Sequence, residues 1–345
     1  MATTGEVWRE ATWRRSGRSG TVVSPASAGK VSRLADVAVV TLNWNGKEFL
    51  PDMVRSLVAR MEGGDLRLIV FDNGSTDGSD RMVEEEFGEN PWFSLVRSEE
   101  NLGFARGANT VLSGLEEELV VLANTDVVFE EDSIDRLLET LRKRPRAGLV
   151  GPMLLWPGGS LQPAKRDFPF PGKLLREHLP LLRRFSAKHS PHDREVSVDW
   201  VVGAVMAIRM KAFREVGGFE ESFFFYHEET DLQYRLWRHG WEVWFQPQAR
   251  VVHLEGGSAR QKYGRDSYLY YIPAKLRFLD RHGTCCSVPM FRVLMTVLQL
   301  FRLLLGLLRP GLRRRDNRFT TSYCSRALGL AWSYIGRKAD EVKKG

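Results

Sequence analysis

The sequence predicts an α/β protein with a mostly parallel central sheet flanked by helices. Three observations support this fold class. Short runs of apolar, β-prone residues alternate with segments whose apolar residues recur at helical spacing. The run Val120–Ala123 is apolar throughout, as in a strand buried on both faces. Polar residues follow several runs, and the carboxyl ends of parallel strands are where such sheets bind ligands.

Each expected strand is a short apolar run bounded by turn residues. These runs are Val37–Leu42, Leu66–Phe71, Phe93–Arg97, Val120–Ala123, Ala147–Leu155, Asp199–Ile208, Val243–Phe245 and Val251–His253. The last two flank Pro247 and are expected to be separate strands. Apolar residues between Phe49 and Met61 fall at helical spacing and predict a helix after the first strand.

Composition limits the class of protein. The 345 residues are 43% hydrophobic, which suffices for one large core or two modest ones. The net charge of +7 is concentrated at the two ends, and residues 1–35 are expected to form a mobile basic tail. No folded recognition motif accompanies the basic ends, so nucleic acid is not an expected partner. Three cysteines form no disulfide framework and no apolar leader is evident, which favours a cytoplasmic location.

The polar residues at strand ends are the candidates for nucleotide binding. Asp72 can accept a hydrogen bond from the imide N–H of uracil or thymine, or it stabilises the turn at Gly74. Trp44 can stack on the base or belong to the core. Arg106 can meet a phosphate or the base, or face solvent. Because the sequence lacks the GxxxxGK[ST] and GxGxxG motifs, a metal at Asp126 is the simplest way to hold phosphates, although Asp126 can also cap a turn.

Several motifs occur together in the order typical of one enzyme family. They are Asn43–Gly46, Asp72–Ser79, Asn101–Phe104, Asn124–Asp126, Gly203–Ala204, Gly217–Phe219, Glu228–Asp231 and Val252–His253. Across residues 37–280 the chain resembles the GT-A domain of family 2 glycosyltransferases, and in particular the rhamnosyltransferase-like branch. The resemblance implies an inverting transferase that uses a nucleoside-diphosphate sugar and a divalent metal, Mg²⁺ or Mn²⁺.

The resemblance also assigns residues. The last Asp of the family's Asp-x-Asp element, which binds the metal, falls on Asp126, and a metal-ligating His falls on His253. A lone His after apolar residues is more often a core residue, and the resemblance reverses that expectation. Asn124 replaces the first Asp, where an amide can still bond ribose. The expected nucleotide-binding residues are Thr41, Trp44, Asn45, Asp72, Asn101, Arg106, Asn124 and Arg260, the last as a mobile clamp over the diphosphate.

Three carboxylates fall in the first turn of a predicted helix, where the helix dipole favours their ionised forms. Transfer to a hydroxyl requires a general base. The resemblance places it on Glu229, where an Asp is usual, with Asp231 as the competing candidate. Asp231 can instead pair with Arg235 at i,i+4 spacing. Glu228 is a candidate for holding the acceptor.

The domain prediction divides the chain at residues 36, 156 and 266. Residues 36–265 form the expected GT-A domain, with a nucleotide-binding half (36–155) and an acceptor and catalytic half (156–265). The irregular segment 162–196 is either an acceptor-side flap or a floppy insertion. Residues 266–345 are expected to be helical and membrane-associating.

Residues 288–308 are strongly apolar, yet Arg292, Thr296, Gln299 and Arg302 draw one polar stripe along the predicted helix. We expect this helix to lie in the membrane interface, assisted by arginines in 309–318 that face anionic lipid. The alternatives are packing on the domain or on a second copy in a homodimer, and a true span, which an arginine near its centre disfavours.

The sequence thus predicts an enzyme at the inner face of the cell membrane. It moves a sugar, for which the resemblance suggests rhamnose, from a nucleoside-diphosphate donor to a hydroxyl of a lipid-linked or polysaccharide acceptor in surface glycan synthesis. A nucleotidyltransferase and a non-catalytic nucleotide-sugar-binding protein are the competing interpretations.

Overall fold

The computed structural model describes residues 37–64, 66–178, 181–223, 226–254, 267–309, 318 and 320–334. Contacts divide the chain into two compact units. The first comprises Met1–Arg166, Pro191–Phe224 and Glu228–Ser258, and the second comprises Asp167–Ser190, Phe225–His227 and Ala259–Gly345. The basic tail predicted for 1–35 and the predicted clamp Arg260 lie outside the described residues.

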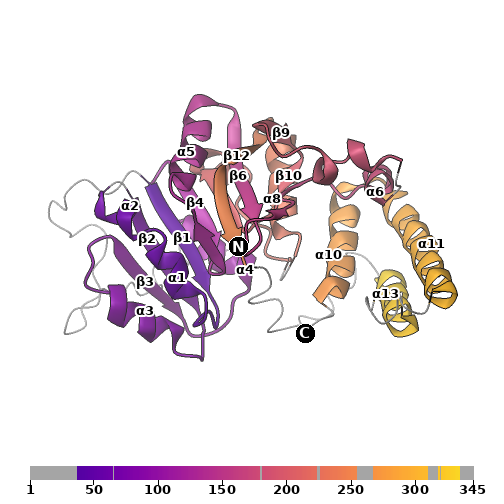
Figure 1. Ribbon diagram of the computed structural model, residues 1–345, viewed down its shortest axis with the longest axis horizontal. Coiled ribbons are helices and arrows are strands. Elements are labelled where there is room, and N and C mark those ends of the chain that lie inside the picture. The colour runs from indigo at the N-terminus through magenta and orange to yellow at the C-terminus, as the bar shows by residue number, and fades with distance from the viewer. Residues whose placement is uncertain are drawn as a thin grey trace, which may run out of the picture. The chain divides into compact units, whose positions relative to one another are not determined.

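The first unit is built on one sheet, and Figure 1 shows its strands side by side. Their order is β3-β2-β1-β4-β11-β6-β12-β5, with β7 beside β6 and β9 beside β12. The strands are β1 (Val37–Asn43), β2 (Leu66–Asn73), β3 (Phe93–Ser98), β4 (Leu119–Asn124), β5 (Val127–Phe129), β6 (Ala147–Leu155), β7 (Leu161–Gln162), β9 (Val196–Val198), β11 (Val205–Arg209) and β12 (Glu242–His253). A separate pair consists of β8 (Lys165–Arg166) and β10 (Trp200–Val201).

Strand direction decides which loops meet. β2, β1 and β4 are parallel neighbours, as are β2 and β3, and β12 runs parallel to β6. Between them β11 is antiparallel to both β4 and β6, so β4, β6 and β12 also share one direction. The carboxyl ends of β1, β2, β3, β4, β6 and β12 therefore lie along the same edge of the sheet. The predicted, mostly parallel α/β sheet is confirmed.

Helices cover this sheet because their apolar positions recur on one side. In the first unit they are α1 (Leu50–Arg55), α2 (Val58–Glu62), α3 (Ser79–Phe87), α4 (Phe104–Leu112), α5 (Ser133–Lys143), α7 (Met210–Glu215) and α8 (Glu228–Arg238). α4 packs on β1 and β2, and α5 packs on β6 and β12. Phe71 and Phe245 are among the largest fully buried side chains, and each such side chain stabilises the fold by roughly 1.5–3 kcal/mol.

The structure differs from the expected elements in three places. The helix expected over 49–61 is interrupted after Arg55, where the Ser56 hydroxyl donates to the Met53 carbonyl and accepts from Phe129 N–H. The strand expected over 199–208 is split into β10 and β11. The two strands expected around Pro247 are one strand, β12, whose register with β6 shifts between Gln246 and Arg250, because proline cannot donate to the ladder.

The second unit is mainly helical. Its helices are α6 (Pro171–His178), η3 (Arg183–Phe185), η4 (Ala187–His189), α10 (Ser267–His282), α11 (Ser287–Leu308) and α13 (Thr321–Ser333). α10, α11 and α13 pack on one another, and α11 also contacts α6. Among the described residues α11 is the one helix long and apolar enough to cross a membrane, by length and composition.

The polar stripe of α11 faces α13 and not solvent. The Arg292 guanidinium donates to the backbone carbonyls of Ala331 and Tyr334. Trp332 Nε1 donates to the Thr296 hydroxyl, and Gln299 is fully buried. The opposite face is apolar and exposed. It consists of Met290, Val293, Val297, Leu300, Phe301, Leu304, Leu307 and Leu308, each more than half exposed. The helix therefore presents its apolar side outward, the reverse of a typical soluble helix.

Candidate active site

Polar residues gather at the carboxyl edge of the sheet because they end strands that share one direction. Asn43 ends β1, Asn73 ends β2, Asn124 ends β4 and His253 ends β12. Asp72 and Asp126 lie one residue before the end of β2 and two residues after β4. The sequence-predicted candidates are thus brought to one edge, where open α/β sheets bind ligands.

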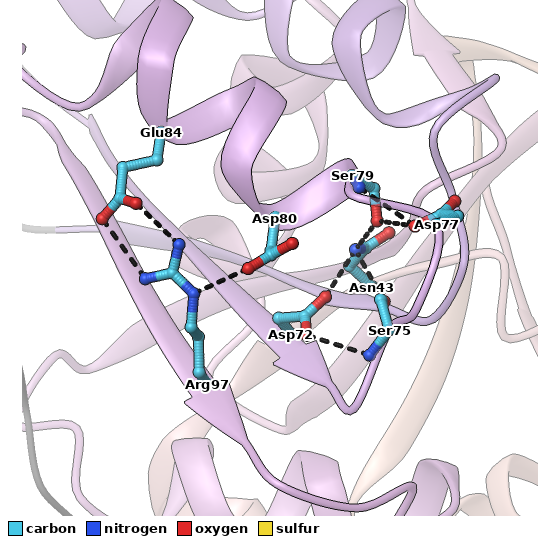
Figure 2. A network of polar contacts seen from close by, with 8 residues as sticks. All are labelled: Asn43, Asp72, Ser75, Asp77, Ser79, Asp80, Glu84 and Arg97. Carbon is cyan, nitrogen blue, oxygen red and sulfur yellow. Dashed lines mark hydrogen bonds and ion pairs between the residues drawn. The ribbon is translucent and has the colours of Figure 1, made fainter.

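Asp72 is held by a hydrogen-bond network that Figure 2 shows in detail. Its Oδ1 accepts from the Asn43 side-chain amide (2.8 Å) and its Oδ2 accepts from Ser75 N–H (3.0 Å). The same Asn43 nitrogen lies 2.7 Å from the Ser79 hydroxyl, which donates to Asp77. Asp72 is 3% exposed, and this network holds its carboxylate in one orientation.

A second set of contacts fixes the loops after β2 and β3. Asn73 accepts from Leu102 N–H (2.8 Å), and its amide lies 3.3 Å from the Asn101 side-chain oxygen. Gly74 has φ +74°, and a Cβ there would come within 2.7 Å of the Glu100 carbonyl carbon. The predicted role of Asn101 in nucleotide binding thus coincides with a loop contact, since its oxygen also accepts from Gly103 N–H.

Hydrogen bonds also tie the loop after β1 to the loop after β2. Asn45 adopts φ +52°, and its side-chain oxygen accepts from Thr76 N–H (2.8 Å). Trp44 beside it is partly buried. Thr41, two residues before Asn43 on the same face of β1, is fully buried, and its hydroxyl has no hydrogen-bond partner among the described residues. Arg106 is exposed in α4.

Asp126 and His253 approach each other where β5 pairs with the end of β12. Oδ1 of Asp126 lies 3.6 Å from Nε2 of His253, and both residues are 7% exposed. The Asp126 carbonyl accepts from Leu254 N–H (2.9 Å), which fixes the two strand ends together. Nδ1 of His253 lies 2.9 Å from the side-chain oxygen of Gln162.

The geometry of this pair fits a divalent cation. Two ligand atoms that are each about 2.1 Å from one ion and separated by 90–120° lie about 3.0–3.6 Å apart. A carboxylate oxygen and an imidazole nitrogen are a donor set that Mn²⁺ and Mg²⁺ accept. The described residues contain no cluster of three or more His, Cys, Asp or Glu side chains suited to a metal. A cation bound here would therefore take its remaining ligands from water and from a bound phosphate.

The carboxylates at the start of α8 occupy different environments. Glu228 is buried, and its Oε2 has no hydrogen-bond partner in the described structure. Burial, together with the negative charge of Glu229, raises the pKa of the Glu228 carboxyl well above its usual range. Glu229 itself is only partly buried. A buried carboxyl group with a raised pKa thus stands next to a more accessible one.

Asp231 is engaged in a buried ion pair. Its carboxylate is fully buried and accepts from Arg235 Nε at 2.7 Å. The other guanidinium nitrogens donate to the carbonyls of Val216 (2.6 Å) and Gly218 (2.7 Å). The i,i+4 alternative that the sequence offered for Asp231 is therefore present, and it joins α8 to the turn after α7.

Glu229 and Asp126 flank one short turn. A Cβ on Gly203 would lie 3.1 Å from both Cβ and Cγ of Glu229, so the glycine leaves room for this side chain. The next residue, Ala204, accepts a hydrogen bond from Asn124 N–H (2.9 Å), two residues before Asp126. Gln233, one turn after Glu229, donates to and accepts from the backbone of Val201. The candidate base thus packs on a turn whose next residue is bonded to the strand end that precedes Asp126.

The sequence profile described as Glycosyl transferase family 2 matches residues 36–217, more than half of the chain. The chain belongs to glycosyl transferase family 2. A profile described as the N-terminal domain of galactosyltransferase also matches residues 183–256 of this glycosyltransferase.

Curated relatives agree with this assignment. The N-acetylglucosaminyl-diphospho-decaprenol L-rhamnosyltransferase of Mycobacterium tuberculosis is 30% identical over 246 residues, which cover 65% of this chain and 78% of the relative. A low-salt glycan biosynthesis hexosyltransferase of Haloferax volcanii is 25% identical over 71% of this chain and 75% of its own. The resemblance to the rhamnosyltransferase-like branch is confirmed.

Solved structures support the fold. The mannosyltransferase of Pyrobaculum calidifontis in complex with GDP-Man and Mn²⁺ superposes with a TM-score of 0.53 at 16% identity, over 90% of this chain and 76% of that one. GalNAc-T7 with UDP, GalNAc and Mn²⁺ gives a TM-score of 0.52 at 16% identity, over 71% and 51% of the two chains. The predicted GT-A fold is confirmed.

The sequence prediction missed residues that act through others. Asn43 lies in a recognised motif but was not assigned the role of orienting Asp72. Gln162 and Gln233 lay in segments without a motif, so no sequence signal marked their contacts with His253 and Val201. Gln162 falls at the start of the segment expected to be a flap, and the structure places it in β7 against β6.

Proposed function

We propose that this family 2 glycosyltransferase moves a sugar from a nucleoside diphosphate to an acceptor hydroxyl with inversion at the anomeric carbon. The observation that carries the proposal is the approach of Asp126 to His253, whose facing side-chain atoms lie 3.6 Å apart at the carboxyl edge of the sheet. Glu229 packs on Gly203, and the carbonyl of the next residue, Ala204, accepts a hydrogen bond from Asn124 N–H. The metal-binding pair Asp126 and His253 suits a diphosphate, and Glu229 suits proton removal.

The nucleotide is held by the edge formed by β1, β2 and β4. Asp72, oriented by Asn43, accepts the imide N–H of a uracil or thymine base, and the buried Thr41 hydroxyl finds a partner when the base is bound. Asn124 reaches the ribose. Asp126 and His253 would hold Mg²⁺ or Mn²⁺, which neutralises the charge that develops on the leaving diphosphate.

Transfer requires that the acceptor oxygen lose its proton as it attacks the anomeric carbon. Glu229 takes this proton, the new glycosidic C–O bond forms, and the bond between the sugar and the diphosphate breaks. Support for Glu229 over Asp231 comes from the ion pair that engages Asp231 with Arg235. Glu228, whose carboxyl pKa is raised by burial, lies beside the base and is assigned to holding the acceptor.

The relative in Mycobacterium tuberculosis is named for an L-rhamnosyl donor group and a diphospho-decaprenol acceptor. By analogy we assign rhamnose as the sugar and a lipid-linked or polysaccharide hydroxyl in surface glycan synthesis as the acceptor. Such an acceptor places the enzyme on the cytoplasmic face of the cell membrane.

The exposed face of α11 is the proposed membrane contact. Eight large apolar side chains lie on it, and an exposed patch of this kind is typical of a lipid or protein contact. Basic residues follow the helix in sequence, at Arg309, Arg313, Arg314, Arg315 and Arg318. This combination of an apolar helix face with clustered arginines fits an anionic bilayer surface.

The transfer reaction is tested by measuring released nucleoside diphosphate from a panel of activated sugars with a lipid-linked acceptor extract, with and without a chelator. Release of nucleoside diphosphate that is lost with chelator and in Asp126→Ala supports the proposal. Release of pyrophosphate would identify a nucleotidyltransferase instead, and donor binding without turnover would identify a non-catalytic binding protein.

Membrane contact is tested by flotation with phosphatidylglycerol vesicles. We expect Val297→Ser combined with Leu304→Ser to reduce flotation, while Leu181→Ser, an exposed apolar residue outside α11, leaves it unchanged. Loss of a dimer in place of lost flotation would assign the apolar face to a second copy of the chain.

A further inference from the structure

We propose that Gln162 is a positioning residue that sets the imidazole of His253 for metal binding. The proposal deepens the function proposed above, because it names a residue outside the metal contact that controls the site. The observation behind it is the 2.9 Å contact between the Gln162 side-chain oxygen and Nδ1 of His253.

Gln162 is well placed for a permanent role. It is 7% exposed and lies in β7, where it pairs with Leu154 of β6 in antiparallel register. Its neighbour Leu161 points the other way and is 43% exposed. Because successive residues of a strand face opposite sides, the hairpin turns Gln162 toward the site and Leu161 toward solvent.

The contact selects one tautomer of the imidazole. An amide oxygen only accepts, so Nδ1 of His253 carries the proton and Nε2 keeps its lone pair. In the opposite neutral tautomer an unprotonated Nδ1 would face the amide oxygen, so two acceptors would meet at 2.9 Å. Two acceptor atoms, one carboxylate oxygen and one imidazole nitrogen, thus face each other.

A cation binds two such acceptor atoms at once. Partners that hold the second nitrogen of a ligating histidine fix its ring orientation and its basicity, and their loss typically weakens metal affinity by about 10–100-fold. Gln162 stands in that relation to His253. It supplies no ligand atom to the proposed metal site.

The test measures Mn²⁺ binding to the full chain by electron paramagnetic resonance of free Mn²⁺, with and without UDP. Gln162→Met keeps the side-chain volume and removes the amide oxygen, and we expect Mn²⁺ affinity to fall about 10-fold or more. Gln162→Glu restores an acceptor and is expected to retain affinity within a few-fold. Leu161→Ala, in the same strand, is the matched control and should bind as the unaltered chain does. Thermal melting verifies that each variant is folded.

The outcomes separate this proposal from the function on which it rests. If Gln162→Met binds Mn²⁺ as tightly as Leu161→Ala while Asp126→Ala loses binding, the positioning role is wrong and the metal site stands. If Asp126→Ala binds Mn²⁺ like the unaltered chain, both are wrong. A loss in Gln162→Met that Gln162→Glu reverses supports the proposal, since mere disruption of β7 would not be reversed by a carboxylate.

Discussion

Glu229→Gln and Asp231→Asn are expected to fail in different ways, one in rate and the other in stability. Asp231 is fully buried and 2.7 Å from Arg235 Nε. At an effective dielectric constant of about 20, the attraction at this distance is about 6 kcal/mol before desolvation is subtracted. Removing one partner of a buried pair typically costs about 3–5 kcal/mol.

The lower end of that range applies to Asp231→Asn. Arg235 retains its bonds to the carbonyls of Val216 and Gly218, and the asparagine oxygen still accepts from Nε. A loss of about 3 kcal/mol at about 2–4 °C per kcal/mol lowers the Tm by about 6–12 °C. Glu229 is only partly buried, so its isosteric change to Gln should alter stability by less than about 1 kcal/mol.

The rate should respond in the opposite order. Loss of a general base typically costs about 10²–10⁴ in kcat, which we expect of Glu229→Gln with unchanged donor affinity. The assay follows nucleoside diphosphate release at saturating donor, with calorimetric donor binding and thermal melting on the same preparations. The reasoning is refuted if Asp231→Asn loses turnover at an unchanged Tm while Glu229→Gln remains active, because the roles of the two carboxylates are then exchanged.

Two further predictions concern stability. Because burial raises the pKa of the Glu228 carboxyl above its ordinary value of 4.5, the folded state binds more protons than the unfolded state at pH values above 4.5, and stability falls as the pH rises toward the folded pKa. Glu228→Gln should therefore stabilise the protein more at pH 8 than at pH 5, as measured by urea unfolding midpoints. Equal shifts at both pH values would contradict the raised pKa of this carboxyl. Gly74→Ala should lower the free energy of unfolding by more than the roughly 1–2 kcal/mol of a left-handed alanine, because the added Cβ meets the Glu100 backbone. Gly64→Ala is the matched control, since Gly64 has a similar φ of +82° and no atom within 4 Å of the added Cβ. Equal melting temperatures for the two variants would show that the close approach at Gly74 is unimportant.

Much of the fold follows from local pattern. The run Val120–Ala123 lies inside β4, and Ala147–Leu155 is β6 with the predicted bounds. These elements are predictable because short apolar runs bounded by turn residues are typical of strands in a sheet that is covered on both faces. The same pattern predicts Asp126 and His253 at strand ends, where the structure has them.

Other features depend on tertiary contacts. Along α11 the periodicity located the polar stripe correctly, but it could not show that Arg292 bonds to α13 or that Gln299 is fully buried. A helical pattern gives the direction of each side chain around the helix axis. It carries no information about which neighbouring helix covers each side. The helix itself was predicted, but its contact with α13 comes from the structure alone.

The sequence by itself determined the α/β sheet, the order of its polar strand ends and the membership of the chain in a transferase family. Tertiary structure decided that Asp231 is engaged by Arg235, and that Gln162 reaches His253 across 91 positions of sequence. The physical reason is that burial and backbone periodicity are local properties of the chain. A contact between distant side chains depends on strand order and register, which no single segment encodes.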